Sequence, residues 1–263
     1  MNLRLFLFSF LNTTNMKKST FVLALLSAGL LSASQASAVE HYISGSFGIP
    51  VYQDLNSSFS FYDSANVNLI RDTKISLNSG ILLFGAVGVD YGNVRIEGEA
   101  GYQTFNFNKI KVHSTGSGNT NNNPISVYVY DLFGGAFNET STFDVAGKGS
   151  LTSLMANAYY DLPVGGKIKP YVTAGVGMAQ VRYVGFGING LPNPVGSNEL
   201  NRQNLDTTTI AYQFGAGIAL PVSNKVTLDA RYRYFVTAHY DLAVYEDTSL
   251  QNHQFLVSVR VGI

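Results

Sequence analysis

Polar and apolar residues alternate strictly over long parts of this chain. In residues 94–103, VRIEGEAGYQ, the charged side chains of Arg95, Glu97 and Glu99 stand at every second position, with apolar or small residues between them. A period of two places these two sets on opposite faces of a β-strand. The pattern therefore predicts strands with one polar and one apolar face.

Eight segments follow this pattern: residues 41–49, 81–91, 94–103, 151–160, 168–180, 207–220, 225–235 and 253–263. Each is close to the roughly 9 to 11 residues with which a tilted strand crosses a bilayer. The connections alternate between long (50–80, 106–150, 182–206) and short (90–93, 161–167, 221–224), and 236–252 is intermediate. Long and short connections thus fall at opposite ends. We predict an all-β fold, an eight-stranded, antiparallel, up-and-down transmembrane β-barrel.

The N-terminus has the pattern of a secretory signal peptide. Lys17 and Lys18 precede an apolar run over residues 21–31, and Ala36-Ser37-Ala38 forms a small-residue cleavage site. We expect residues 1–38 to be a cleaved signal peptide, with Met16 as an alternative start, and residues 39–263 to form one β-barrel domain.

The amino-acid composition excludes some classes of binding partner and some means of stabilising the fold. The expected leader carries three of the 17 basic residues and none of the 17 acidic ones, which leaves the mature chain with a net charge of −3. This balance argues against nucleic acid as a partner. The chain has no cysteine, so closure of the barrel, rather than disulfide bonds, must make the fold rigid.

Alternation alone does not show which face is wet, because a soluble lipocalin-type barrel has the same period with its polar face outside. Tyrosines near the predicted strand ends and glycines on the polar face favour a membrane barrel with a narrow, polar interior. The last segment also ends at the final residue of the chain. Its apolar row resembles the C-terminal signal that the outer-membrane assembly machinery reads, and consists of Phe255, Val257, Val259, Val261 and Ile263.

Four stretches resemble one known family. In chain order they are LMANAYYDLP (residues 154–163), KIKPYVTAGVGMA (167–179), AYQFGAGIAL (211–220) and LDARYRYF (228–235). Together they resemble the opacity-protein and OmpA-like family of eight-stranded outer-membrane barrels, with the major surface antigens as the nearest type. The resemblance implies an outer-membrane location in a Gram-negative bacterium, long loops facing outside, and a surface antigen or adhesin without catalytic residues.

The third and seventh predicted strands lie opposite each other on a closed ring of eight. If their inward residues match in height, Arg95 pairs with Asp229, Glu97 with Arg231 and Glu99 with Arg233 across the lumen. We interpret these six residues as a structural charge network that fills the barrel. An arginine on the lipid face would instead cost about 2–4 kcal/mol near the bilayer centre.

Other candidates for chemistry are few. The apolar run ISVYVYDLFGGAF (residues 125–137) lies in a predicted loop and either extends the strands or offers a contact patch of Val127, Tyr128, Tyr130, Leu132, Phe133 and Phe137. GFGING (185–190) is interpreted as a loop, because no helix follows that could receive a phosphate. The four histidines show no metal-ligand spacing. We therefore predict no cofactor, no metal site and no catalytic site.

We predict an outer-membrane surface protein, an antigen or adhesin whose filled barrel anchors four external loops that bind host or extracellular partners. Its expected partners are outer-membrane lipid, the assembly machinery and a host surface protein. The main alternative is a small porin that conducts through the charged lumen. A lipid-modifying enzyme, with an outward serine or aspartate beside His253, is a third interpretation, and a soluble ligand-binding barrel is the fourth.

Overall fold

The computed structural model describes residues 39–62, 68–113, 140–188, 203–242 and 245–263 of the chain. Within these ranges no helix is long and apolar enough to span a membrane. The described residues form β1 (Glu40–Tyr52), β2 (Leu55–Tyr62), β3 (Asn68–Asp90), β4 (Val94–His113), β5 (Thr140–Asp161), β6 (Lys169–Ile188), β7 (Gln203–Pro221), β8 (Val226–Thr237), β9 (Tyr240–Leu242), β10 (Tyr245–Thr248) and β11 (Gln251–Gly262).

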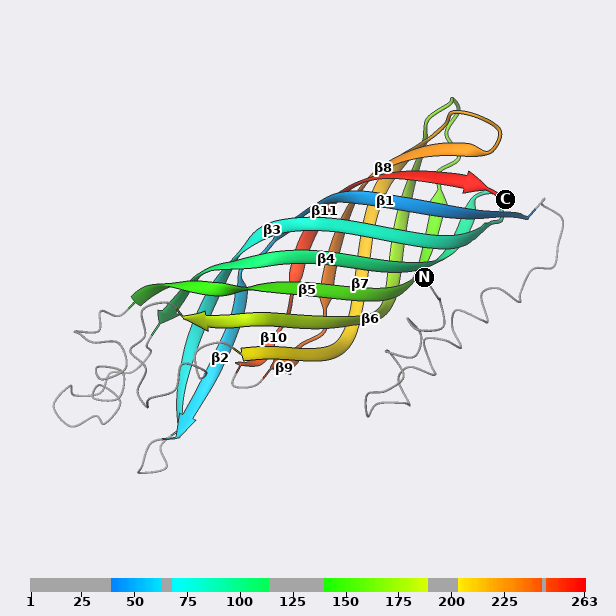
Figure 1. Cartoon of the computed structure of the whole chain (residues 1–263). Coiled ribbons are helices and arrows are strands. Elements are labelled where there is room, and N and C mark those ends of the chain that lie inside the picture. Colours follow the sequence, from blue (N-terminus) through cyan, green and yellow to red (C-terminus); the bar gives the residue numbers. More distant parts are fainter. Residues whose placement is uncertain (1–38, 63–67, 114–139, 189–202, 243–244) are drawn as a thin grey trace.

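Eight of these strands close into a ring. Its order is β1, β3, β4, β5, β6, β7, β8 and β11, and β1 completes it by pairing with both β3 and β11. All eight pairings are antiparallel. Each of the eight predicted segments overlaps a different strand of the ring, so the predicted eight-stranded barrel is confirmed (Figure 1).

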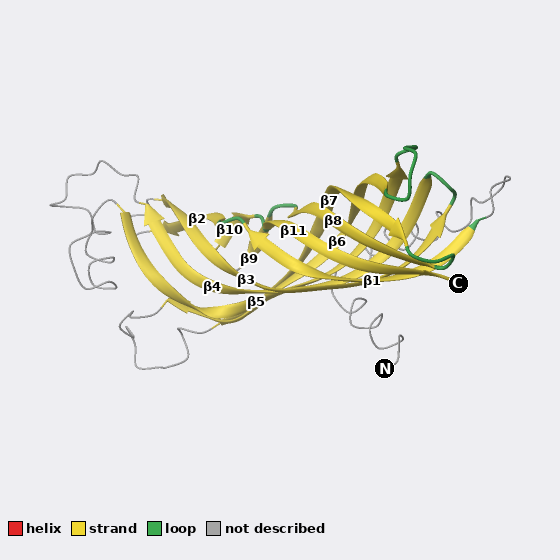
Figure 2. Ribbon diagram, turned by 90° about the horizontal axis from the view of Figure 1, so that it is seen from above, coloured by secondary structure: helices red, strands yellow, loops and turns green. Residues whose placement is uncertain are grey.

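The barrel has a turn end and a loop end. The C-terminus and the short turns after β3, β5 and β7 lie at the turn end (Figures 1 and 2). At the loop end lie the strand ends that border residues 114–139, namely the last residues of β4 and the first residues of β5. This segregation agrees with the alternation of long and short connections in the sequence.

Three of the strands are about twice as long as the predicted segments. β3, β4 and β5 contain 23, 20 and 22 residues. The expectation of loops over 50–80 and 106–150 is therefore wrong for 55–62, 68–80, 106–113 and 140–150, all of which are strand. Residues 185–188 of the GFGING stretch also belong to a strand, β6, rather than to a loop.

The reason is that the polar and apolar faces exchange sides along each long strand, as β4 shows. Near the turn end, Val94 and Tyr102 are exposed on the outside, whereas Glu97 is buried inside. Further along, Phe105 is buried inside, and Asn106 is exposed on the outside. We call the part with an apolar outside the lower barrel and the part with an apolar inside the upper barrel.

The exchange has a simple physical meaning. An apolar exterior with a polar interior suits a strand surrounded by lipid, whereas the opposite arrangement suits one surrounded by water. On β4 the lower barrel covers nine residues, from Val94 to Tyr102, which is the length that crosses a bilayer. The predicted segments therefore correspond mainly to the lower barrel.

Irregular backbone gathers near the boundary between the two parts. The pairing of β5 with β6 is bulged between Ala146 and Lys148, and that of β6 with β7 between Tyr183 and Phe186. The residues at these bulges, Gly147 and Gly185, have φ angles of 128° and 63°, which glycine adopts without steric cost. On the remaining side, two-residue segments outside any strand separate β1 from β2 (53–54), β8 from β9 (238–239) and β10 from β11 (249–250).

Candidate functional site

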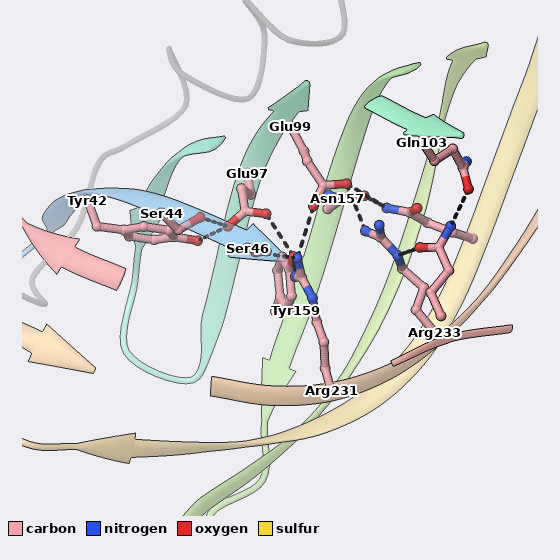
Figure 3. Close-up of polar contacts among 12 residues, drawn as sticks. Tyr42, Ser44, Ser46, Glu97, Glu99, Gln103, Asn157, Tyr159, Arg231 and Arg233 are labelled. Carbon is pink, nitrogen blue, oxygen red and sulfur yellow. Dashed lines mark hydrogen bonds and ion pairs between the residues drawn. The ribbon is translucent and has the colours of Figure 1, made fainter. Parts of the chain in front are cut away.

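The six charged residues predicted to share the lumen do so. All are buried in the lower barrel and belong to β4 and β8, which lie opposite each other in the ring. Figure 3 shows four of them, Glu97, Glu99, Arg231 and Arg233, pointing toward one another. The six residues are Arg95, Glu97, Glu99, Asp229, Arg231 and Arg233. Their pairing, however, differs in part from the expected one.

Glu99 is the centre of the network. Its Oε1 accepts a hydrogen bond from Arg233 Nη1 at 2.7 Å, and its Oε2 accepts one from Arg231 Nη2 at 3.1 Å. Gln213 Nε2 lies 3.5 Å from Glu99 Oε1. The expected contact between Glu99 and Arg233 is therefore present, and a second arginine shares the same carboxylate. Such charge-assisted bonds between fully buried groups are among the stronger polar contacts in proteins.

Glu97 does not pair directly with Arg231, so this expectation is wrong. Its carboxylate accepts hydrogen bonds from Tyr159 Oη at 2.8 Å, Tyr42 Oη at 3.2 Å and Ser44 Oγ at 3.4 Å. Arg231 Nη1 in turn donates to Tyr159 Oη at 2.6 Å. The Tyr159 hydroxyl therefore links the arginine to the carboxylate.

The expected pair of Arg95 and Asp229 is also wrong. Arg95 forms a two-pronged ion pair with Asp161, with Nη2–Oδ1 and Nε–Oδ2 distances of 2.7 and 3.1 Å. Asp229 Oδ2 lies 4.0 Å from Arg260 Nε. Barrel strands are inclined to the barrel axis, so opposite strands cross rather than run side by side. Side chains of β4 and β8 meet where the strands cross, at Glu99, and residues further along find partners on other strands.

An aromatic layer closes the interior above this network. Phe105 packs against Tyr52 and Tyr183 with ring centroids 5.0 and 6.0 Å apart, and Phe107 packs against Tyr183 and Phe186 at 4.9 and 4.7 Å. Edge-to-face contacts of this kind are favourable beyond the burial of area. These five residues, which we call the aromatic seal, come from β1, β4 and β6 and so reach across the ring.

Further apolar side chains, most of them from other strands, complete this layer. The buried cluster that contains the seal also includes Leu55, Ile75, Ile110, Val145, Leu151, Met155, Ala179, Val181, Ala211, Phe235, Tyr240 and Leu250. The hydroxyls of Tyr183 and Tyr240 are 2.9 Å apart. Burial raises the pKa of Tyr240 to about 12, so this pair stays protonated at neutral pH.

The seal was not predicted from the sequence. A signal was present, since residues 105, 107 and 110 are apolar and the residues between them are Asn106, Asn108 and Lys109. This is a strand pattern continued with the faces exchanged. Gly149 is a further sign of the seal in the sequence, because a β-carbon at this position would overlap the Phe105 ring.

The comparisons with known proteins agree with this architecture. The family model described as the outer membrane protein beta-barrel domain matches residues 21–261. The chain belongs to this family. It is therefore an outer-membrane β-barrel protein of the Gram-negative type, and the apolar exterior of its lower barrel is the face that meets lipid.

The relatives found by sequence comparison include an opacity protein and an outer-membrane protein. Opacity protein opA51 of Neisseria gonorrhoeae is 29% identical over 192 residues, covering 66% of this chain and 75% of the relative. Outer membrane protein PagN of Salmonella typhimurium is 27% identical over 235 residues, covering 82% and 83%. Among solved structures, Neisserial surface protein A is 15% identical with a TM-score of 0.47, covering 86% of this chain and 100% of that one.

The remaining predicted residues are placed as follows. The C-terminal row lies on β11 and at its end, where Phe255, Val257, Val259 and Ile263 are exposed on the outer face. This position is compatible with an assembly signal, and that role stays a prediction. The proposed contact patch, Val127, Tyr128, Tyr130, Leu132, Phe133 and Phe137, lies outside the described residues.

The pair required for a lipid-modifying enzyme is not formed by His253 and Ser258. Ser258 is buried in the lumen, whereas His253 lies on the other face of β11. His253 Nδ1 is 2.7 Å from Tyr232 Oη, and its Nε2 is 3.3 Å from Gln53 Nε2. Among the described residues, no group of three or more histidine, aspartate or glutamate side chains could hold a metal ion.

Proposed function

We propose that this outer-membrane barrel is a surface adhesin, in which the barrel is a closed anchor and the external loops bind a host or extracellular partner. The observation that carries this proposal is the occupied interior. Charged and hydrogen-bonded side chains line the inside of the lower barrel, and a continuous apolar cluster crosses the upper barrel. Such an interior supports an anchor better than a pore.

The upper barrel supports the same function. On β4 it adds the eleven residues from Gln103 to His113. At about 3.3 Å per residue and a tilt near 40°, these residues raise the loop end roughly 28 Å above the lipid. Loops held on a rigid, water-exposed support at this height are suited to reaching a partner outside the cell.

The proposal is tested by adhesion of bacteria that express this protein to cultured epithelial cells. Replacing residues 114–139 by a Gly-Ser linker should abolish adhesion, because this segment contains the apolar run of the predicted contact patch. The triple substitution Tyr128→Ser, Phe133→Ser and Phe137→Ser should reduce it to a similar degree if the patch makes the contact.

A control is needed for barrel assembly. Heat-modifiable electrophoretic migration of each variant should match that of the unaltered protein. Adhesion equal to that of the parent, with the linker variant correctly assembled, would contradict binding through this loop. Stable ion conductance by the unaltered protein in a planar bilayer would instead favour the porin alternative.

A further inference from the structure

Ten buried side-chain atoms in the described part of the chain have no hydrogen-bond partner within the protein, and nine of them share one location. These nine belong to residues that face the lumen below the aromatic seal, and the tenth belongs to Asn252, which lies beside Tyr52 of the seal. The atoms are Gln103 Nε2, Ser153 Oγ, Asn157 Nδ2, Gln213 Oε1, Asp229 Oδ1, Arg231 Nε, Arg233 Nη2, Asn252 Oδ1, Ser258 Oγ and Arg260 Nη1.

We infer that the lower barrel holds a hydrated vestibule entered from the periplasmic end, and that the aromatic seal, rather than the charge network, closes it toward the outside. The inference rests on the proposed function, because it takes the unaltered barrel to be closed. The inference goes beyond that function by naming the layer that closes the barrel and the water that occupies the lumen beneath this layer.

Water fits the chemistry of these ten atoms. They include N–H donors such as Arg233 Nη2, acceptors such as Asp229 Oδ1, and hydroxyls such as Ser258 Oγ. Buried polar groups in proteins are almost always satisfied, and internal water commonly supplies the missing partners. A molecule that both donates and accepts satisfies this mixed set, which neither an anion nor a cation alone would do.

The accessibility of the charged side chains indicates where water enters. At the turn end, which faces the periplasm in this family's arrangement of short turns, the side chains of Asp90, Arg260 and Asp161 are 27%, 12% and 11% exposed. Further up, those of Glu99 and Arg233 are 0% and 1% exposed. The solvent exposure of the charged side chains therefore declines from the periplasmic end toward the seal.

The polar lining ends at the seal. Tyr52 Oη donates to Gln103 Oε1 at 3.0 Å, and this is the contact between the topmost polar side chains and the aromatic layer. Above it, the ring packs against Phe105, and the cluster continues with side chains that carry no charge. An apolar constriction stops ions by excluding water, without any need for a charged gate.

Planar-bilayer recordings of the purified full-length barrel test the assignment. The variant Phe105→Ser with Tyr183→Ser removes two facing rings of the seal from different strands. Phe84→Ser is a matched control, since this phenylalanine also faces the lumen but lies below the seal, under Arg233. Glu99→Gln alters the charge network alone.

The expected result is stable conductance steps from the double seal variant, and silence from the unaltered protein, Phe84→Ser and Glu99→Gln. A folded seal variant that stays silent, or a Glu99→Gln variant that conducts, would overturn the assignment of the seal. Conductance by the unaltered protein would contradict the proposed closed anchor itself, so the two failures are distinguishable.

Cysteine labelling tests the vestibule independently of any seal variant. The chain has no cysteine, so Ser258→Cys in the lower lumen and Ile110→Cys in the apolar cluster of the upper barrel each provide a unique thiol. A charged methanethiosulfonate reagent that the outer membrane excludes should label Ser258→Cys only after the periplasm is opened, and Ile110→Cys in neither case. Failure to label Ser258→Cys in opened cells would overturn the vestibule.

Discussion

Removal of the Glu99 carboxylate should destabilise the barrel far more than removal of the neighbouring Glu97 carboxylate. Both are buried glutamates on β4, two residues apart, and both face the lumen. Glu99 forms ion pairs with Arg231 and Arg233, whereas the hydrogen bonds to Glu97 come from hydroxyl groups of Tyr42, Ser44 and Tyr159. The two glutamates thus form a matched pair with different partners.

The expected magnitudes follow from these contacts. Glu99→Gln leaves two buried guanidinium groups without their counter-charge, which costs about 3–5 kcal/mol when a buried pair loses one partner. Glu97→Gln keeps an oxygen acceptor for the hydroxyl donors, so its cost should be about 1 kcal/mol, the difference between a charged and a neutral hydrogen-bond acceptor. The double variant Glu99→Gln with Arg233→Gln should lose less than the sum of the single losses.

Urea unfolding of the barrel in lipid vesicles measures these differences. Because the chain has no tryptophan, far-UV circular dichroism is the suitable signal, with heat-modifiable migration as a second one. A loss for Glu97→Gln equal to that for Glu99→Gln would refute the reasoning. So would strict additivity of Glu99→Gln and Arg233→Gln, since it would mean that the two side chains do not interact.

Three further tests probe the faces, the seal and the turn end. Val87→Arg places a charge on the lipid face of the lower barrel and should cost about 2–4 kcal/mol in vesicle unfolding, whereas Asn106→Arg on the outside of the upper barrel should change stability by less than about 0.5 kcal/mol. Gly149→Ala forces a β-carbon into the Phe105 ring and should cost about 1–3 kcal/mol, largely restored by adding Phe105→Leu. Asp161→Asn removes the counter-charge of the lowest arginine on β4 and should cost about 3 kcal/mol by the same measurement, and an unchanged midpoint would contradict that ion pair.

The membrane-crossing part of the fold could be predicted because its alternation is regular and its strands have bilayer length. The upper barrel could not, since polar residues such as Asn106, Asn108 and Lys109 face outward there and resemble those of a loop. The period of two continues through them. What changes is the medium around the strand, from lipid to water. A search for strands with an apolar outer face therefore ends where the strand leaves the lipid, although the strand itself continues.

The charged residues could be assigned to the lumen, but only one of their three expected contacts is formed. Local alternation determines which face of a strand a side chain takes, and it contains no information on how obliquely two distant strands cross. The partner of Arg95 depends on the register between β4 and β5, in which Arg95 lies opposite Tyr159 and so next to Asp161. A connection of residues 106–150 does not fix that register from the sequence.

The exchange of faces along the strands also bears on the order of events during biogenesis. The apolar residues of the upper barrel come from strands throughout the ring, so they can pack together only after those strands have passed through the lipid. Their burial cannot help the first strands to insert, because it is gained at the end. The same packing must be undone before any strand can be withdrawn. Packing in the upper barrel therefore adds little to the rate of insertion and much to the lifetime of the inserted state.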